Sequence, residues 1–388
     1  MTVDLTLSDP TQLRLEFATA DRDRAWQQSQ SFASAGDRWN AFLNRLCLNT
    51  LLPWLREERQ LQATVWPHTN ALPSFWALVS GTALTLNVSE RVILLPTETI
   101  DRDEWRIPQE WVDIPAWSAD YYLAVHVEPE DGWLQVWGYT THRRLKAQGH
   151  YDAHDRTYCL TESAIVPDLN VLWVARELGV ETTRAVVFPL PAIDLAQADN
   201  LITRLGNPSI VVPRLEVPFS LWGALVEHGG WRQRLYERRQ GMGESRSVLQ
   251  WLETNLSTLA QQLGWERIEQ QPGLIGARGG EDAVSTTLLS RQLTIAGQTY
   301  DLQISPQGNS VERTWRFTLR NAAPGGVVPG GFTLRLLTED LQPFEQNEDT
   351  ATTAIEQLFV EVALAPGEGI VWEIEPIPDG YDREILQF

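Results

Sequence analysis

The amino-acid sequence predicts an α+β protein with N-terminal helices and a small strand-rich, barrel-like unit, a helical middle, and a C-terminal antiparallel β-sandwich. Three observations support this prediction. Apolar residues recur at helical spacing and then alternate in the first part of the chain, recur at helical spacing again within residues 193–269, and alternate strictly towards the C-terminus. A chain of 388 residues also exceeds what one hydrophobic core usually organises, so we expect three regions, 1–192, 193–269 and 285–388.

The N-terminal region combines one long helix with several short strands. Asp37 is the expected N-cap of the helix, and Pro53 either kinks that helix or begins a new one. In YYLAVHVEPEDGWLQVWGY, residues 121–139, apolar residues alternate along two strands and PEDG closes a hairpin between them. Several short strands of this kind predict a small barrel or a curled sheet. The apolar stripe of the helix consists of Trp39, Phe42, Leu43 and Leu46.

The middle of the chain carries two further apolar stripes at helical spacing, each ended by a glycine. Periodicity then fades in the glycine-rich segment 270–283, which is the best candidate boundary. We expect limited proteolysis to cut within residues 273–280 and to leave two folded pieces. The stripes are Ala198, Leu201, Ile202 and Leu205 before Gly206, and Val248, Leu252, Leu256, Leu259 and Leu263 before Gly264.

The C-terminal region switches to a period of two. In TWRFTLR, Trp315, Phe317 and Leu319 are expected inside, and the residues between them outside. The segment IVWEIE, residues 370–375, repeats this pattern, and turn-forming segments such as SPQGN, APGGVVPGG and APGEG separate the runs. Six or seven such strands predict an antiparallel sandwich.

Charge and composition exclude several classes of protein. The 51 acidic and 31 basic residues give a net charge of −20, which repels nucleic acid and anionic membranes. No apolar run approaches the roughly 18 residues of a membrane span, and the first ten residues lack the features of a secretory signal. Cys47 and Cys159 are too few for a disulfide framework and indicate a reducing compartment. We therefore expect a cytoplasmic protein without nucleic-acid or membrane partners.

Two residue types have unusual frequencies. Lys146 is the single lysine, so the other 30 basic residues are arginine. The chain also contains 17 tryptophans, and a ring of that size either fills a core or forms a stacking surface. The sequence alone assigns no function to either excess.

Residues 149–160, GHYDAHDRTYCL, have the composition of a metal site. They hold two histidines, two aspartates and a cysteine, and His142 lies a few positions upstream. The flanking residues predict a turn that runs into a strand, and on a strand His150 and His154 would be ~13 Å apart. Two ligands of one zinc ion must each come within about 2 Å of the metal, so this spacing suits zinc only if the loop folds back. We expect a solvated hairpin loop, no stoichiometric zinc and no cofactor.

Residues 231–239, WRQRLYERR, form the candidate partner-binding segment. Arginine interleaved with aromatic residues is used to bind single-stranded nucleic acid, but it also describes an amphipathic helix whose charged side faces water. Because the net charge of the protein opposes nucleic acid, a solvated face is the favoured interpretation. The functional alternative is binding to an acidic partner or to the acidic part of the same chain. The candidate residues are Trp231, Arg232, Arg234, Tyr236, Arg238 and Arg239.

No motif in the chain predicts catalysis. HGGW, residues 228–231, is similar to the oxyanion-hole motif of esterases, but the chain has no G-x-S-x-G nucleophile elbow. A helix that stops and restarts is the better interpretation. The glycine pairs in GARGGEDA and PGGVVPGGF lack the lysine and the following helix of a phosphate loop, so both are expected to be turns. We expect no catalytic residues.

The end of the chain is strongly acidic. Residues 336–388 contain thirteen acidic residues and one base, Arg383. These carboxylates are scattered over strands and turns and are not paired in an apolar pocket, so they do not indicate acid–base catalysis. Such a charge favours a protein partner with a basic surface, bound in a salt-sensitive way.

Three segments resemble one protein family: RWNAFLNRLCLNTLLPWLRE, VWGYTTHRRLKAQGHYDAHDRTYCL, and the run from VVPGGFTLRLL to LAPGEG. They are similar to the cyanobacterial proteins grouped as domain-of-unknown-function family 1822. The resemblance covers most of the chain and implies no established activity. It implies genomic neighbours that encode caspase-like proteases and alternative sigma factors. It also implies seven recurring positions, to which neither His150 nor His154 belongs: Trp137, Gly138, Tyr139, Tyr151, Asp152, Arg156 and Tyr158.

These observations favour a non-catalytic adaptor or regulatory protein that binds another protein, in a signalling system with a caspase-like protease or a sigma factor. Two alternatives stay open. One is a hydrolase whose active site is assembled from residues distant in sequence, and a deep cleft with titratable groups would support it. The other is a carbohydrate-binding sandwich with exposed, coplanar Trp315 or Trp372. We expect both of these tryptophans to be buried.

Overall fold

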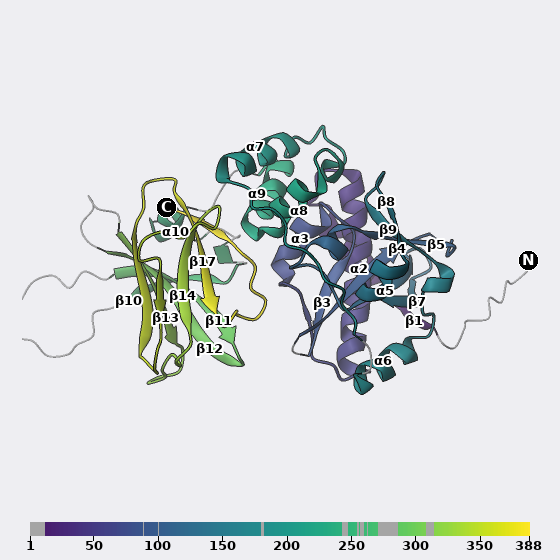
Figure 1. The fold of residues 1–388 in the computed structure, drawn as a ribbon, viewed down its shortest axis with the longest axis horizontal. Coiled ribbons are helices and arrows are strands. Elements are labelled where there is room, and N and C mark those ends of the chain that lie inside the picture. The colour runs from purple at the N-terminus through teal and green to yellow at the C-terminus, as the bar shows by residue number, and fades with distance from the viewer. Residues whose placement is uncertain are drawn as a thin grey trace, which may run out of the picture. The chain divides into compact units, whose positions relative to one another are not determined.

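The computed structural model describes residues 12–87, 89–99, 101–179, 182–242, 247–253, 256, 260–261, 263–270, 286–307 and 314–388. The chain forms two compact units, unit 1 with residues 1–242 and unit 2 with residues 243–388. Unit 1 mixes helices with sheets, and unit 2 consists mainly of two antiparallel sheets (Figure 1). The predicted α+β fold class is confirmed.

Unit 1 is built around a curled, six-stranded sheet in the order β1-β7-β6-β4-β3-β2. Neighbouring strands are antiparallel except β4 and β6, which are parallel. The ladder between β6 and β7 shifts register between Ala124 and Val125, which marks a bulge that bends the sheet. The strands are β1 (Leu13–Glu16), β2 (Ala63–Val65), β3 (Thr82–Leu86), β4 (Glu90–Thr97), β6 (Tyr121–Glu128) and β7 (Trp133–Thr141).

The long helix α2 (Ala35–Glu57) packs against β1, β2, β4 and β6 of this sheet (Figure 1). Its N-cap is Ser34, whose hydroxyl accepts a hydrogen bond from the Asp37 N–H at 3.0 Å. The prediction of Asp37 as the cap is therefore wrong by three residues, and Asp37 lies in the first turn. The helix continues through Pro53. Of its predicted stripe, Phe42, Leu43 and Leu46 are buried, but Trp39 is exposed.

Shorter elements cover the rest of the sheet, and β6 is buried at seven of its eight residues. The expected alternation of inward and outward residues on β6 is therefore wrong, because residues of both faces are buried. The PEDG turn between β6 and β7 is confirmed.

A second, three-stranded sheet has the order β5-β9-β8, with β5 (Glu104–Pro108), β8 (His150–Asp152) and β9 (Thr157–Thr161). The helices are α1 (Thr19–Ser29), α3 (Leu72–Trp76), α4 (Glu110–Asp113), α5 (His142–Gln148), α6 (Leu169–Leu178), α7 (Leu195–Leu205), α8 (Phe219–Glu227) and α9 (Gly229–Arg239), with 3-10 turns η1 (Thr69–Ala71), η2 (Glu162–Ala164) and η3 (Pro213–Leu215).

The first predicted stripe of the middle region is confirmed on α7, where all four stripe residues are buried and Gly206 is the C-cap. The second stripe is only partly described, because α10 (Val248–Glu253) carries its first two residues and 257–259 lie outside the described residues. The glycine-rich segment 273–280, the expected site of proteolysis, also lies outside them. Among the described residues, no helix has both the length and the apolar composition needed to cross a bilayer.

Unit 2 is a sandwich of a five-stranded sheet, β10-β11-β12-β13-β16, and a four-stranded sheet, β15-β14-β17-β18. All neighbouring strands are antiparallel, as predicted. The strands are β10 (Trp265–Gln270), β11 (Thr286–Ile295), β12 (Gln298–Gln307), β13 (Thr314–Asn321), β14 (Thr333–Thr338), β15 (Glu348–Thr350), β16 (Gln357–Ala363), β17 (Gly369–Glu375) and β18 (Ile385–Gln387).

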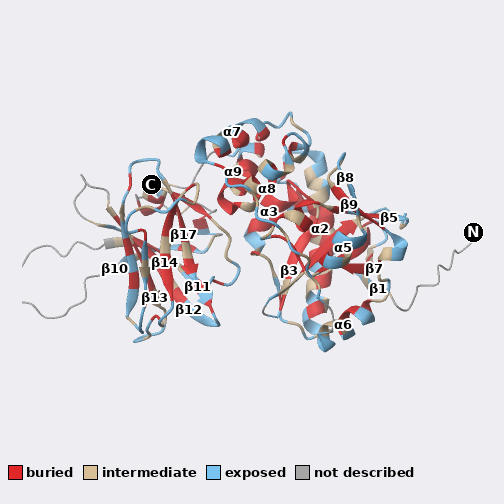
Figure 2. Cartoon of the chain, in the orientation of Figure 1, coloured by how far each residue is buried: buried red, intermediate tan, exposed pale blue. Residues whose placement is uncertain are grey.

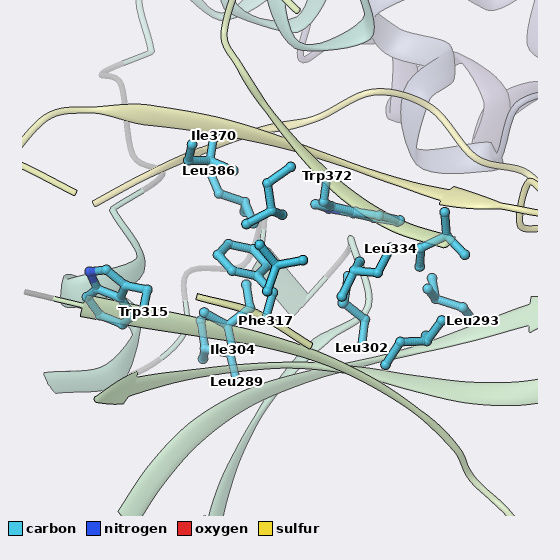
Figure 3. Packing of buried hydrophobic residues seen from close by; sticks show 14 of the residues in the cluster. Leu289, Leu293, Leu302, Ile304, Trp315, Phe317, Leu334, Ile370, Trp372 and Leu386 are labelled. Atoms are coloured by element: carbon cyan, nitrogen blue, oxygen red, sulfur yellow. The ribbon is translucent and has the colours of Figure 1, made fainter. Parts of the chain in front are cut away.

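The apolar core of unit 2 lies between its two sheets (Figure 3). Trp315, Phe317 and Leu319 of β13 point inward and are 2%, 0% and 0% exposed, as the period of two predicts. Ile370, Trp372 and Ile374 of β17 belong to the same core, but Val371 is also buried, so β17 departs from strict alternation. The strands of unit 2 carry both buried and exposed positions (Figure 2). Trp251 of α10 and Trp265 of β10 belong to this core. Two elements that precede residue 285 are therefore built into the sandwich.

Candidate functional site

The histidine-rich stretch forms the β8–β9 hairpin, so the interpretation as a turn running into a strand is confirmed. His150 and His154 are exposed. The carboxylates beside them are bound by an arginine: Arg106 Nη1 lies 3.0 Å from Asp152 Oδ2 and 2.7 Å from Asp155 Oδ2. The His154 amide, and then Arg106, lower the pKa of Asp152 below its usual value. In the described part of the chain, no group of three histidine, cysteine or acidic side chains could hold a metal ion.

His142, the third histidine of the suspected metal site, is held inside unit 1. Its Nε2 donates to the Val112 carbonyl at 2.9 Å, and its Nδ1 accepts from the Ala185 N–H at 3.0 Å. Both ring nitrogens are therefore used within the protein. Burial is the main reason why the pKa of His142 is lowered, so the ring is neutral at pH 7 and serves to fasten the segment after α6.

The single lysine lies at the centre of a polar cluster beside the hairpin. Lys146 Nζ donates to Asp113 Oδ1 at 2.8 Å and to the Tyr158 hydroxyl at 2.7 Å. The Tyr158 hydroxyl donates in turn to Asp113 Oδ2 at 2.8 Å. Gln109 donates to the same carboxylate at 2.9 Å and accepts from the Tyr151 hydroxyl at 2.8 Å. The cluster joins α4, α5 and both strands of the hairpin.

The protonation states of this cluster suit a structural role. Burial raises the pKa of Tyr158 to about 12. Burial alone would lower the pKa of Lys146, but the hydrogen bonds to Asp113 and Tyr158 outweigh it and raise that pKa. Burial also raises the pKa of the Cys159 thiol to about 11. At pH 7 the amine, the phenol and the thiol all keep their protons, so none of the three is an activated nucleophile or base.

A buried ion pair next to the hairpin has no counterpart among the sequence predictions. Glu110 is 0% exposed and accepts from Arg214 Nε at 2.8 Å, Arg214 Nη2 at 2.7 Å and Trp222 Nε1 at 2.8 Å. Arg214 also donates to the carbonyls of Asp155 and Arg156 in the hairpin loop. The partners are more than 100 residues apart in sequence, so no local pattern could have indicated this pair.

The candidate partner-binding residues lie on α9, and the structure separates them by burial. Trp231, Arg232, Tyr236 and Arg239 are buried, Arg234 is partly exposed, and Arg238 is exposed (Figure 2). The expectation that α9 shows its arginines to water is therefore wrong for Arg232 and Arg239. Partner binding through α9 stays a prediction. Of the six candidate residues, only Arg234 and Arg238 are accessible to a partner.

The two buried arginines of α9 are held by the protein itself. Arg232 Nε donates to the Ser74 hydroxyl at 3.1 Å, and its guanidinium lies 3.9 Å from the centroid of the Phe75 ring. Arg239 Nη1 donates to the carbonyls of Leu205 and Ile210 at 2.9 and 3.1 Å. A period of 3.6 identifies an apolar face by residue type and misses an arginine that is buried by hydrogen bonds and ring stacking.

The other suspected motifs form turns and helix ends. α8 ends at Glu227 and α9 begins at Gly229, so HGGW is a helix stop and restart, as predicted. The His228 ring caps α9 by accepting from the Trp231 N–H at 3.3 Å. In PGGVVPGGF, Gly325 and Gly331 have φ of +71° and +92° and precede strand β14, which confirms turns. The stretch GARGGEDA, residues 276–283, lies entirely outside the described residues.

The strand region of unit 2 presents carboxylates that no arginine of that region neutralises. Residues 286–307 and 314–388 contain five arginines, and each forms an ion pair with a carboxylate. Four exposed carboxylates in the same residues form no ion pair: Glu345, Glu356, Glu368 and Asp379. The five pairs are Arg291–Glu384, Arg316–Glu361, Arg320–Asp301, Arg335–Glu348 and Arg383–Glu373.

One of these carboxylates lines a surface cavity of about 480 Å³ at one end of the sandwich. The cavity also contains the loop 321–327 and the pair of Asp301 and Arg320, whose nearest atoms are 3.7 Å apart. Its lining offers two carboxylates against one guanidinium, so it has a net negative charge. Such a lining suits a cationic group better than an anion.

A profile of the family described as "Protein of unknown function (DUF1822)" matches residues 15–387, nearly the whole chain. The chain belongs to the DUF1822 family. The resemblance inferred from the three sequence segments is confirmed. No curated protein and no solved structure matches the sequence.

Several positions that the DUF1822 resemblance singles out hold loops onto the sheet of unit 1. A Cβ on Gly138 would lie 2.5 Å from the Ile165 side chain, so only glycine lets the loop after β9 approach β7. Tyr139 exchanges backbone hydrogen bonds with Val166 in the same loop. Arg156 donates to the carbonyls of Arg214 and Val217. In this DUF1822 chain, Arg156 therefore fastens the β8–β9 hairpin to residues 214 and 217, and the Gly138 and Tyr139 contacts fasten the loop after β9 to β7.

Proposed function

We propose that the protein is a non-catalytic adaptor or regulatory protein that acts by binding another protein, and that this partner presents a basic surface. The observation that carries the proposal is the set of four exposed, unneutralised carboxylates in the strands and loops of unit 2. Unpaired surface charge of one sign steers an oppositely charged partner and selects against nucleic acid.

Two further observations support binding over catalysis. The phenol of Tyr158, the amine of Lys146 and the thiol of Cys159 all have raised pKa values, which argues against a hydrolase centred on the hairpin. Trp315 and Trp372 are 2% and 1% exposed, as expected, so neither offers a sugar a stacking face on the sandwich. The proposal includes a cytoplasmic location and a signalling system with a caspase-like protease or a sigma factor as the source of the partner.

Affinity capture with matched charge variants tests this proposal. One variant neutralises the unpaired acids of unit 2 (Glu345→Gln, Glu356→Gln, Glu368→Gln, Asp379→Asn). The control removes four exposed acids of unit 1 (Asp103→Asn, Glu130→Gln, Asp131→Asn, Glu162→Gln), which changes the net charge equally. We expect the wild type and the control to retain the same basic protein from native cells, and the unit 2 variant to lose it.

Salt dependence gives a second criterion. Steering by exposed charges weakens as the Debye length falls to roughly 8 Å at physiological ionic strength, so retention should decline with added salt. If all three proteins retain the same partner at every salt concentration, or if no protein is retained at all, the acidic-surface proposal is wrong.

A further inference from the structure

Arginine covers the tryptophans that are only half-buried. Of the 17 tryptophans, twelve are buried, three are half-buried and two are exposed. Each half-buried indole has a guanidinium over its face, and all six residues belong to unit 1. The distances to the ring centroid are 4.1 Å for Arg14 over Trp133, 5.8 Å for Arg59 over Trp54 and 3.8 Å for Arg91 over Trp66.

The two exposed tryptophans lack such a cover. Trp26 on α1 and Trp39 on α2 are 41% and 40% exposed, and no arginine or lysine of the described chain stands over either ring. Their ring centroids are 5.9 Å apart at an interplanar angle of 71°, so they form an edge-to-face pair. Phe42 supports both rings from α2, at 5.3 Å from Trp26 and 5.2 Å from Trp39.

A carboxylate lies beside this pair. The Trp39 Nε1–H donates to Glu98 Oε2 at 2.6 Å, and Glu98 is exposed. The nearby cations of α1 are bound elsewhere, because Arg22 pairs with Asp23 and Arg24 with Asp21, each at 3.0 Å. A guanidinium placed over the indoles could therefore stack on a ring and donate to the second oxygen of Glu98.

We propose that Trp26, Trp39 and Glu98 form a docking site for an arginine side chain of the partner protein. Guanidinium is planar and weakly hydrated, so it stacks on an indole face and forms a bidentate pair with a carboxylate better than an ammonium does. The chain already places a guanidinium over each half-buried indole, and the exposed pair offers a ring face and a carboxylate to a second molecule. The inference rests on the proposed function, since it names the chemistry of the basic partner.

Indole NMR signals test this site directly. Protein labelled with 15N-tryptophan gives one indole N–H signal for each of 17 tryptophans, and Trp26→Phe and Trp39→Phe assign the two of interest. The probes are capped Gly-Arg-Gly, Gly-Lys-Gly and Gly-citrulline-Gly peptides, because citrulline keeps the shape of arginine without its charge. We expect the arginine peptide to shift the Trp26 and Trp39 signals most and to bind at least about threefold more tightly than the lysine peptide. The citrulline peptide should cause no saturable shift.

Three variants make the test specific. Glu98→Gln keeps both rings and should weaken binding of the arginine peptide severalfold, and Trp26→Leu with Trp39→Leu should abolish it. Trp133→Phe is the matched control, because Arg14 already covers that ring, and it should bind like the wild type. The indole signals of the other 15 tryptophans report whether each variant keeps its fold.

The outcomes separate this inference from the proposed function. Equal shifts with arginine and citrulline peptides, or arginine-dependent shifts confined to tryptophans other than Trp26 and Trp39, overturn the docking site while leaving an acidic-surface adaptor intact. Loss of the captured partner in the Trp26→Leu, Trp39→Leu variant supports the site in the full complex. If the unit 2 charge variant still captures the partner and the indole test is positive, the acidic-surface proposal is wrong and the arginine docking site is supported.

Discussion

The two units use charge in opposite ways. Unit 1 has 22 basic and 30 acidic residues and buries several of them, including Glu110, Arg232 and Arg239 at 0%, 1% and 6% exposure. Unit 2 has nine basic and 21 acidic residues, and most of those described lie around an apolar core, with Arg291 and Glu384 as a buried ion pair. Unit 1 therefore uses several charged side chains inside its structure, whereas the charge described in unit 2 lies mainly on the surface. Removing a buried charge of unit 1, such as Glu110, should therefore damage folding, whereas removing an exposed carboxylate of unit 2, such as Glu356, should damage binding.

Tryptophan shows the same contrast. The four tryptophans of unit 2 are at most 2% exposed and fill the core or its edge. Unit 1 contains the three half-buried indoles, each with an arginine over its face, and the two exposed ones. The acidic surface and the exposed aromatic pair thus lie on different units.

The strongest test of this division is to separate the units. A fragment of residues 243–388 should fold on its own, whereas residues 285–388 should not, because the shorter fragment lacks Trp251 and Trp265 of the core. Removing a buried aromatic side chain costs about 3–5 kcal/mol, and a typical domain is stable by about 5–15 kcal/mol. Denaturant unfolding followed by circular dichroism should be cooperative only for the longer fragment. Equal stability of both fragments would show that α10 and β10 are dispensable and would restore the sequence-based start at residue 285.

The next largest effect should come from the buried ion pair of unit 1. Glu110→Ala should destabilise the protein by about 3–5 kcal/mol, because it leaves the partly buried Arg214 without a carboxylate and the buried Trp222 Nε1 without its acceptor. Glu361→Ala removes the exposed partner of Arg316 in unit 2 and should cost less than about 1 kcal/mol. Urea denaturation measures both. Similar losses for the two variants would break the contrast between the units.

A smaller effect concerns the lysine cluster at high pH. The folded-state pKa of Tyr158 is raised from 10.0 to about 12, so its contribution to stability is present below pH 10 and is lost as the pH rises to about 12. Tyr158→Phe should cost about 1 kcal/mol at pH 7, because its hydrogen bonds are lost, and should reduce the further loss between pH 10 and 12. Denaturation midpoints at pH 8 and 11.5 test this. Tyr151→Phe, at the exposed edge of the cluster, is the control and should change both midpoints less.

The smallest effect should follow removal of the hairpin histidines. His150→Ala with His154→Ala should change stability by less than about 0.5 kcal/mol, because both side chains are exposed. Metal analysis of the purified wild type should find no stoichiometric zinc. One zinc per chain, lost in the double variant together with several degrees of melting temperature, would contradict the interpretation of this hairpin as a solvated loop.

Periodicity predicted those helices and strands whose core-facing residues recur at a regular spacing. The sandwich was predictable because β13 and β17 each direct every second residue into the core, and α7 because its apolar stripe is buried. The pattern failed for β6, which is covered on both faces, and for the start of α2, where Ser34 competes with Asp37 as cap. It also separated α10 and β10 from the strands that they pack on, since local signals do not report tertiary partners.

The polar features of the candidate sites were less predictable. The interleaved arginines of α9 were visible in sequence, but the burial of Arg232 depends on Ser74 and Phe75, which lie about 160 residues earlier. The pair of Trp26 and Trp39 was hidden because Trp39 belongs to the apolar stripe of a core helix, and its exposure depends on tertiary packing that a local pattern does not report. The acidic residues of unit 2 could be counted from the sequence. Which of these carboxylates form no ion pair with an arginine depends on the register of neighbouring strands.

The position of the single lysine determines how this protein can be studied and modified. Lys146 donates to both Asp113 and Tyr158, so the only side-chain amine of the chain is held in a hydrogen-bonded cluster. Amine-directed cross-linkers and acyl-group donors have no other lysine to react with, and tags that are attached through an isopeptide bond to lysine have one acceptor. Reagents that couple carboxylates will map its complexes far better, because 51 acidic side chains are distributed along the chain.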